Sequence, residues 1–390
     1  MKVARSKSRS RGRALRAAQI GLGLLAAVGF WFAGVALQRW FAGRSTAANP
    51  GVNPAVLVGL AEAAITRLDL DGAEKLLAGR AGAPVALARA RLAIYRADCE
   101  GAEALLGADA TRSVEGADEM QAFAHRCAGA TVSGHVIVDE KHGVWIRLQD
   151  RSDEVLVPLI VDTIARARDV IERDLGAQLP RPLRLDLVRD LFSLSAVSGL
   201  PLEAAETTGT VAVARFGRVT MISPRAMLRG YPWQDTLAHE ITHLVLTRAS
   251  HDRAPLWLQE GVAKREETRW RAQRVFDRTP EPALVALQAE ERGESVGVDK
   301  LGPSIAMLPS ADAAGIAFAE VTSFIDTWLE LNGAAALPAL LRDLRVTPDA
   351  DRALRSVSGL GLGEWQLIWR DALRRKYADP ASRRPSASDE

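Results

Sequence analysis

The stretch "LAHEITHLVL", residues 237–246, decides how this chain folds and what it can bind. Its apolar residues recur at helical spacing, so the stretch predicts a helix with one side buried. His239 and His243 stand four residues apart, and a helix places such a pair on one face, where two imidazoles can bind one metal ion. Glu240 projects beside them and can take a proton from water as a general base. Because so short a pattern also arises by chance, other residues must complete the site.

A second segment, "APLWLQEGVAKREE" (254–267), offers the third ligand. A catalytic zinc ion usually has three protein ligands and one open position, and Glu260 follows His243 with sixteen residues between them. Pro255 marks the start of a new helix, and Gly261 leaves room for a close helix approach. Three apolar residues can pack this helix beneath the first: Trp257, Leu258 and Val262. The two segments together predict a three-ligand metal site with a base beside it.

These motifs are specific enough to suggest a family. The pattern His-Glu-x-x-His followed by "WLQEGVA" (257–263) resembles the gluzincin metallopeptidases, and most closely the peptidase MA-like group, whose second motif reads W-L-x-E-G-x-A. The resemblance covers the order of elements across roughly 131–375. It implies a zincin-like fold, one Zn²⁺ ion held by His239, His243 and Glu260, and Glu240 as the base. It also implies a peptide or protein substrate, held in extended form along the strand "RVTMIS" or its neighbour.

The chain departs from the family around this first set of residues. Where the family has a tyrosine in the helix after the site, the chain has Phe318, which cannot donate a hydrogen bond to an oxyanion. Tyr231 is the candidate substitute, although nothing in the sequence places its hydroxyl. A carboxylate should orient a ligand histidine. The candidates are Asp235, Glu266 and Glu267, and an ordinary surface charge is the alternative for each.

Residues 131–378 read as one α+β domain, with strands first and helices after. Alternating or β-branched runs predict strands at 135–138, 144–148, 182–190, 210–215 and 218–223, the last two joined as a hairpin. A helix is predicted over 154–175, and helices follow the metal motifs to about residue 377. The stretches 193–208 and 295–315 read as loops that border the cleft.

Residues 55–130 form a helical module rich in alanine and leucine. "DLDGAEKLLAG" (69–79) and "DCEGAEALLGA" (98–108) resemble each other at an offset of 29 residues, which suggests stacked helical hairpins of a degenerate tetratricopeptide-like type. Such a module can bind a protein partner, or it can act as a plain helical spacer.

The chain has two cysteines, Cys99 and Cys127. An even pair in an oxidising compartment favours a disulfide that would staple the helical module. Two buried free thiols are the alternative.

The N-terminus predicts a membrane anchor. Residues 1–16 hold seven Lys or Arg and no acid, and an apolar span follows over 17–41. The span is long enough to cross a bilayer, and the positive charge before it predicts a cytoplasmic N-terminus with the rest of the chain outside a bacterial cytoplasmic membrane. The alternative is a cleaved signal peptide and secretion. Residues 42–54 read as a linker, and 379–390 as a disordered tail.

The distribution of charged residues along the chain argues against nucleic acid as a partner. Beyond the basic tag the chain holds 43 basic and 48 acidic side chains, without a basic stripe interleaved with aromatics, so nucleic acid is not expected as a partner. The leading hypothesis is a membrane-anchored, zinc-dependent peptidase. The alternative is a catalytically inactive or structural zinc-domain protein that serves as a membrane-tethered binding or scaffold module.

Overall fold

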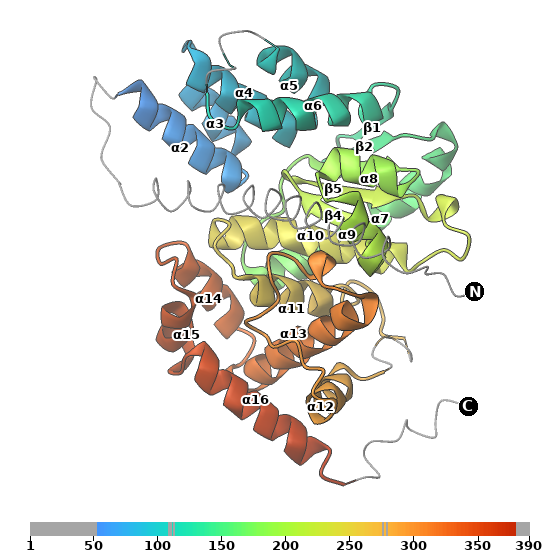
Figure 1. The fold of residues 1–390 in the computed structure, drawn as a ribbon, viewed down its shortest axis with the longest axis vertical. Coiled ribbons are helices and arrows are strands. Elements are labelled where there is room, and N and C mark those ends of the chain that lie inside the picture. The colour runs from blue at the N-terminus through green and yellow to red at the C-terminus, as the bar shows by residue number, and fades with distance from the viewer. Residues whose placement is uncertain (1–52, 108–110, 112–113, 275–276, 278–279, 380–390) are drawn as a thin grey trace, which may run out of the picture. The chain divides into compact units, whose positions relative to one another are not determined.

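A five-stranded sheet organises the chain and carries helices on both of its faces (Figure 1). The computed structural model describes residues 53–379, apart from 108–110, 112–113, 275–276 and 278–279. The predicted basic segment, the anchor, nearly all of the linker and nearly all of the tail therefore lie outside the described residues. Within the part that is described, no helix has the length and apolar character needed to span a bilayer. Residues from Pro54 onward form one compact unit.

The sheet is mixed, and its order is β1-β2-β3-β5-β4. Its two central pairs, β2 with β3 and β3 with β5, are parallel, while the edge strands β1 and β4 run antiparallel to their neighbours. All five predicted strands are confirmed, with these bounds: β1 His135–Asp139, β2 Val144–Leu148, β3 Leu183–Val188, β4 Ala212–Arg215 and β5 Arg218–Ile222. The chain is thus of the mixed α+β class, and β4 forms one edge of the sheet.

The two faces of the sheet differ in chemistry because successive side chains of a strand point to opposite sides. One face is apolar and is covered by α7 (Val157–Leu175) and α10 (Trp233–Ser250), which form the main core with it. The other face carries the buried charged residues Arg147, Asp186 and Arg218. Between the strands, η2 (Arg151–Leu156) precedes α7, and the predicted helix of 154–175 is confirmed over most of its length.

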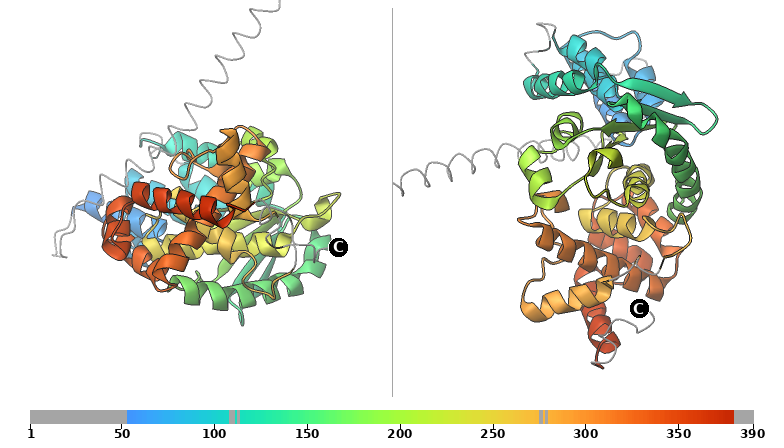
Figure 2. Two further views of the ribbon diagram at one scale, coloured as in Figure 1. Left: turned by 90° about the horizontal axis from the view of Figure 1, so that it is seen from below. Right: turned by 90° about the vertical axis from the view of Figure 1, so that its right-hand side faces the viewer.

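The helical module, α2–α6, packs against the charged face of the sheet (Figure 2). Its helices are α2 Pro54–Thr66, α3 Leu70–Leu77, α4 Ala83–Tyr95, α5 Cys99–Leu106 and α6 Ala117–Thr131. The repeated Asp-x-x-Gly has a physical reason. Asp69 and Asp98 each cap a helix by accepting a hydrogen bond from the glycine N–H three residues on, and a side chain at Gly72 or Gly101 would collide with that carboxylate.

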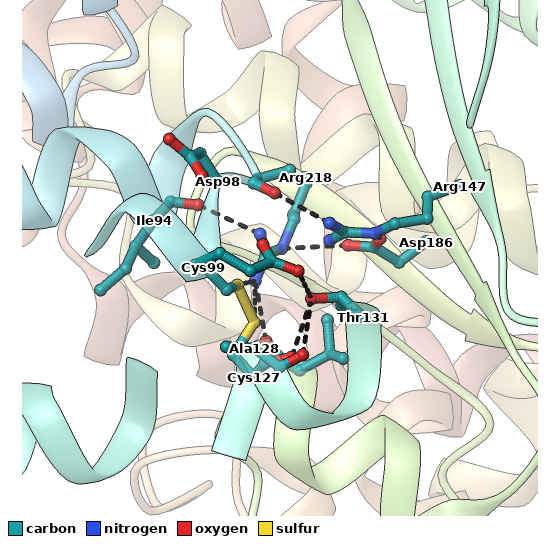
Figure 3. Close-up of a disulfide and its surroundings, with 12 residues drawn as sticks. Ile94, Asp98, Cys99, Cys127, Ala128, Thr131, Arg147, Asp186 and Arg218 are labelled. Carbon is teal, nitrogen blue, oxygen red and sulfur yellow. Dashed lines mark hydrogen bonds and ion pairs between the residues drawn. A yellow bond between two sulfur atoms is a disulfide. The ribbon is translucent and has the colours of Figure 1, made fainter. Parts of the chain in front are cut away.

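Cys99 and Cys127 are joined in a disulfide that ties α5 to α6, with their Cα atoms 5.7 Å apart (Figure 3). Both residues are fully buried. The structure therefore has the pair as a staple within the helical module and not as two free thiols.

The remaining helices correct two predictions. The stretch 193–208 is not a loop, because α8 (Leu191–Ser198) and α9 (Leu202–Thr208) occupy it. The stretch 295–315 is also shorter as a loop than expected, since α13 begins at Ala311. The other elements are η3 Pro224–Ala226, α11 Leu256–Glu266, α12 Pro282–Arg292, η4 Ile305–Met307, α13 Ala311–Asn332, α14 Ala336–Leu344, α15 Ala350–Ser358 and α16 Leu362–Lys376.

Candidate metal centre

The helices α10 and α11 bring the two sequence motifs together. His239 and Glu240 are buried on α10, which has apolar neighbours on most sides. Gly261 explains how α11 reaches its place. A side chain there would collide with the backbone of Val321 and the side chain of Ile325, so the glycine permits close packing against α13. The close approach predicted for this glycine is therefore made with α13.

The three predicted ligand atoms form a compact triangle. The Nε2 atoms of His239 and His243 lie 3.2 Å apart, and an oxygen of Glu260 lies 3.6 Å from each of them. Ligand atoms held about 2.0–2.1 Å from zinc in a tetrahedral arrangement are separated by about 3.3 Å. The side chains therefore fit a zinc ion in both spacing and donor type, because two imidazoles and one carboxylate are a common set for catalytic zinc.

Charge at the triangle favours a cation. Burial lowers the pKa of His239, but Glu260 and Glu267 outweigh it and raise that pKa to about 10. Burial lowers the pKa of His243 to about 4, so this imidazole is neutral and its nitrogen can act as a ligand. Burial also disfavours the charged form of Glu260, but the two histidines outweigh it and lower its pKa. The carboxylate of Glu260 is thus held in its charged form, which is the form that binds a divalent metal.

Glu240 lies beside the triangle and close to the edge of the sheet. Burial raises its pKa to about 7; the charge of Glu260 adds to this, while His239 and a hydrogen bond from the backbone N–H of Ala214 oppose it. Since Ala214 belongs to β4, the edge strand contacts the carboxylate of the predicted base. A carboxyl with a pKa near neutrality suits proton transfer in both directions.

Glu267 is the carboxylate that lies next to a ligand histidine. One of its oxygens is 3.5 Å from Nδ1 of His239, on the opposite side of the ring from the nitrogen that faces the triangle. Its other oxygen is 2.7 Å from the ammonium of Lys264. Lys264 was not among the predicted site residues. Its spacing could have identified it, because it stands four residues after Glu260 and three before Glu267 on the same helix.

The other two candidate carboxylates are engaged elsewhere. Asp235 accepts hydrogen bonds from the indole N–H of Trp270, at 3.0 Å, and from the guanidinium of Arg271. Glu266 is fully buried and paired with the guanidinium groups of Arg265 and Arg269. Asp235 was one of three candidates to orient a histidine, and its hydrogen bonds join the segment after α11 to the start of α10.

The two residues considered for oxyanion stabilisation lie close to the site. The ring centroid of Phe318 is 6.0 Å from that of His239, so α13 does present this position to the metal site, but with a side chain that cannot donate. The hydroxyl of Tyr231 donates to the backbone carbonyl of Ile222. Burial raises the pKa of Tyr231, and the charge of Glu240 adds to the effect, so its hydroxyl stays protonated within electrostatic reach of the base.

Comparisons with protein-family models, with curated proteins and with solved structures give no match for this chain.

Proposed function

We propose that the protein is a zinc-dependent peptidase anchored to the bacterial cytoplasmic membrane by residues 17–41, with its metal domain on the outer side. The observation that carries this proposal is the triangle of ligand atoms from His239, His243 and Glu260, with the carboxylate of Glu240 beside it. A purely structural metal site has no use for a buried base, whereas hydrolysis requires one.

Each residue of the site has its own role in the proposed hydrolysis. When bound, zinc would act as a Lewis acid toward a peptide carbonyl and would lower the pKa of water. Glu240 accepts the proton of the attacking water on its carboxylate and later returns it to the leaving amine. The carboxylate of Glu267 lies 3.5 Å from Nδ1 of His239 and favours a proton on that nitrogen, which leaves Nε2 as the ligand atom, and Lys264 holds Glu267 in that position.

The edge strand β4 supports a mode of substrate binding. β4 has β5 on one side, and its Ala214 contacts Glu240. An extended peptide can add to such an edge through backbone hydrogen bonds, which places a peptide bond near the base without demanding one sequence. We expect broad recognition of extended segments, with selectivity from the surrounding side chains.

The disulfide supports the outward location. Disulfides persist in oxidising compartments such as the bacterial periplasm, and Cys99 and Cys127 are paired. Secretion after cleavage of a signal peptide is the alternative, and fractionation of cells that express the full chain separates the two. Recovery of the intact protein in the soluble periplasmic fraction would exclude the anchor.

The test of the activity compares the full-length protein, purified in detergent, with its Glu240→Gln variant. We expect about one zinc per chain in both, and cleavage of fluorescein-labelled casein that falls at least about a thousandfold in the variant. Glu330→Gln, an exposed change of the same type on α13, is the matched control and should cleave like the wild type. Zinc binding without any cleavage that depends on Glu240 would refute the peptidase.

One observation favours a second candidate, a catalytically inactive zinc domain that acts as a membrane-tethered scaffold through the helical module. Phe318 contacts His239 but cannot stabilise an oxyanion. This reading predicts zinc at the triangle and a protein partner on α2–α6, with no hydrolysis in the casein assay.

A further inference from the structure

The turn between β4 and β5 is strained, and the helical module encloses it. Phe216 and Gly217 form the two-residue turn, and both have positive φ angles, of 54° and 69°. A bulky residue such as phenylalanine rarely adopts this conformation, so surrounding contacts must hold it there. The turn therefore depends on something outside the hairpin.

The aromatic ring of Phe216 supplies that contact. It lies 5.7 Å from the ring of Tyr95 at the end of α4 and 4.9 Å from the ring of Phe123 on α6, measured between centroids. Gly217 also approaches the helical module, since a side chain there would press on Tyr95 and on Leu68, which lies between α2 and α3. The tip of a hairpin from the sheet is thus inserted between helices that precede it by about a hundred residues.

Arg218 fixes the hairpin a second time (Figure 3). Its side chain is completely buried and donates to the carbonyls of Ile94, in α4, and Val197, in α8, at 3.1 Å each. The same guanidinium lies 3.2 Å from the carboxylate of Asp186 and 3.3 Å from the sulfur of Cys127. A buried charge with fixed partners defines one arrangement, because any shift would leave it unpaired.

The β4–β5 hairpin, held at its turn by the helical module, leads at β4 to the candidate metal centre. β4 has only four residues and packs against α10, the helix that carries Glu240, and its Ala214 stands two residues before Phe216. A displacement of the turn therefore moves the backbone that faces the base. We infer that the helical module is a positioning device for β4, and that Phe216 is the positioning residue through which it acts. The inference rests on the proposed function for its catalytic consequence, although its mechanical part does not.

The test uses Phe216→Ala in the full-length protein, with two measurements. Amide hydrogen exchange of residues 212–215 should become about tenfold faster. For labelled casein we expect KM to rise at least about fivefold and kcat to change less than about twofold, because a displaced edge strand loses backbone contacts with the substrate. Zinc content should stay at one per chain. Phe192→Ala, at a ring that is 70% exposed on α8, is the matched control and should change none of these values.

Two further variants separate positioning from simple packing. Phe216→Tyr keeps the ring and should restore the wild-type KM, whereas Phe123→Leu loosens the same contact from the helical side and should raise KM and the exchange of β4 as Phe216→Ala does. If Phe216→Ala does not fold, Phe123→Leu is judged by the same two measurements.

The outcomes distinguish this inference from the proposed function. Unchanged KM and unchanged exchange of β4 in a protein that cleaves casein would overturn the positioning role and leave the peptidase standing. A wild-type protein without cleavage dependent on Glu240 would refute the peptidase, and faster exchange confined to β4 would then still support the mechanical link.

Discussion

Two clusters of buried charged groups lie on opposite sides of the sheet, and they differ in how their groups interact. On the side of the helical module, the guanidinium groups of Arg147 and Arg218 flank the carboxylate of Asp186, at 2.6 and 3.2 Å. On the side of α10, two imidazole nitrogens and a carboxylate oxygen converge on one another. The first cluster pairs donors with an acceptor, whereas the second gathers groups that bind a cation.

The difference separates a cluster whose charges have partners within the protein from a candidate metal site. Arg147 also donates to the backbone carbonyl of Ala97, and Arg218 donates to that of Ile94. Hydrogen bonds and ion pairs within the protein therefore compensate most of the charge that is buried there. In the candidate metal centre, the Nε2 atoms of His239 and His243 lie 3.2 Å apart, and each can be a metal ligand once it carries no proton. A buried arrangement of this kind is stabilised by a metal ion, and the following predictions test that contrast.

The largest effect is expected from removal of a metal ligand. His243→Ala should weaken zinc binding by more than about a thousandfold, because a site that loses one of three protein ligands loses a large share of its binding free energy. The measurement is competition with a zinc-binding fluorophore. The variant should remain folded by circular dichroism, since the contacts of the arginine cluster are untouched. Full retention of zinc would show that the triangle is not the site.

The next effect concerns stability and not metal binding. Arg218→Met should lower the free energy of unfolding by about 3 kcal/mol, because Asp186 loses one of its two cations and two buried carbonyls lose a donor. Urea denaturation measures this change, and zinc affinity of the folded variant should be that of the wild type. A variant as stable as the wild type would show that the cluster is not structural.

A smaller effect is expected where the metal centre meets its supporting carboxylate. Glu267→Gln should weaken zinc binding by about 10–100-fold, since the negative charge 3.5 Å from Nδ1 of His239 is removed. Asp235→Asn is the matched control, because Asp235 is engaged by Arg271, and its zinc affinity should stay within about threefold of the wild type. Equal losses in both variants would mean that Glu267 has no special part in orienting the histidine.

Local patterns predicted the helices that carry the candidate metal ligands. The helical spacing in 237–246 and the Trp-Leu-x-Glu-Gly motif depend on nearest neighbours, and both lie on helices as expected. The stretch 193–208 was predicted as a loop, and its glycine, proline and hydroxyl residues are common in loops. Here Gly199 ends α8 in a left-handed conformation and Pro201 directly precedes α9, while Asp190, before the stretch, caps α8 by accepting from the N–H of Ser193.

Contacts between segments that are distant in the sequence could not be predicted from local patterns. Alternation in β3 and β5 indicates that Asp186 and Arg218 leave the apolar core, but it gives no sign that helices from residues 54–131 cover them. The choice of Glu267 over Asp235 likewise depends on which helix face meets α10. Such facts follow from packing between distant segments, and single-sequence patterns do not contain them.

The smallest effect is expected at Glu320, a buried carboxyl group that neither cluster includes. Glu320 on α13 is buried, and its carboxylate accepts from the hydroxyl of Ser295 at 2.6 Å and from the N–H of Gly297 at 2.9 Å. Burial raises its pKa, although these hydrogen bonds and the charge of Arg370 oppose the shift.

An acid with a raised folded-state pKa contributes most to stability below its unfolded pKa, and the contribution is lost as pH rises through the folded value. The free energy of unfolding of the wild type relative to Glu320→Gln should therefore decrease as pH rises from 4 to 7. An increase of this free-energy difference over that range would mean that hydrogen bonds to the carboxylate outweigh its burial. Glu320 would then resemble Asp186, whose charge is compensated by fixed partners.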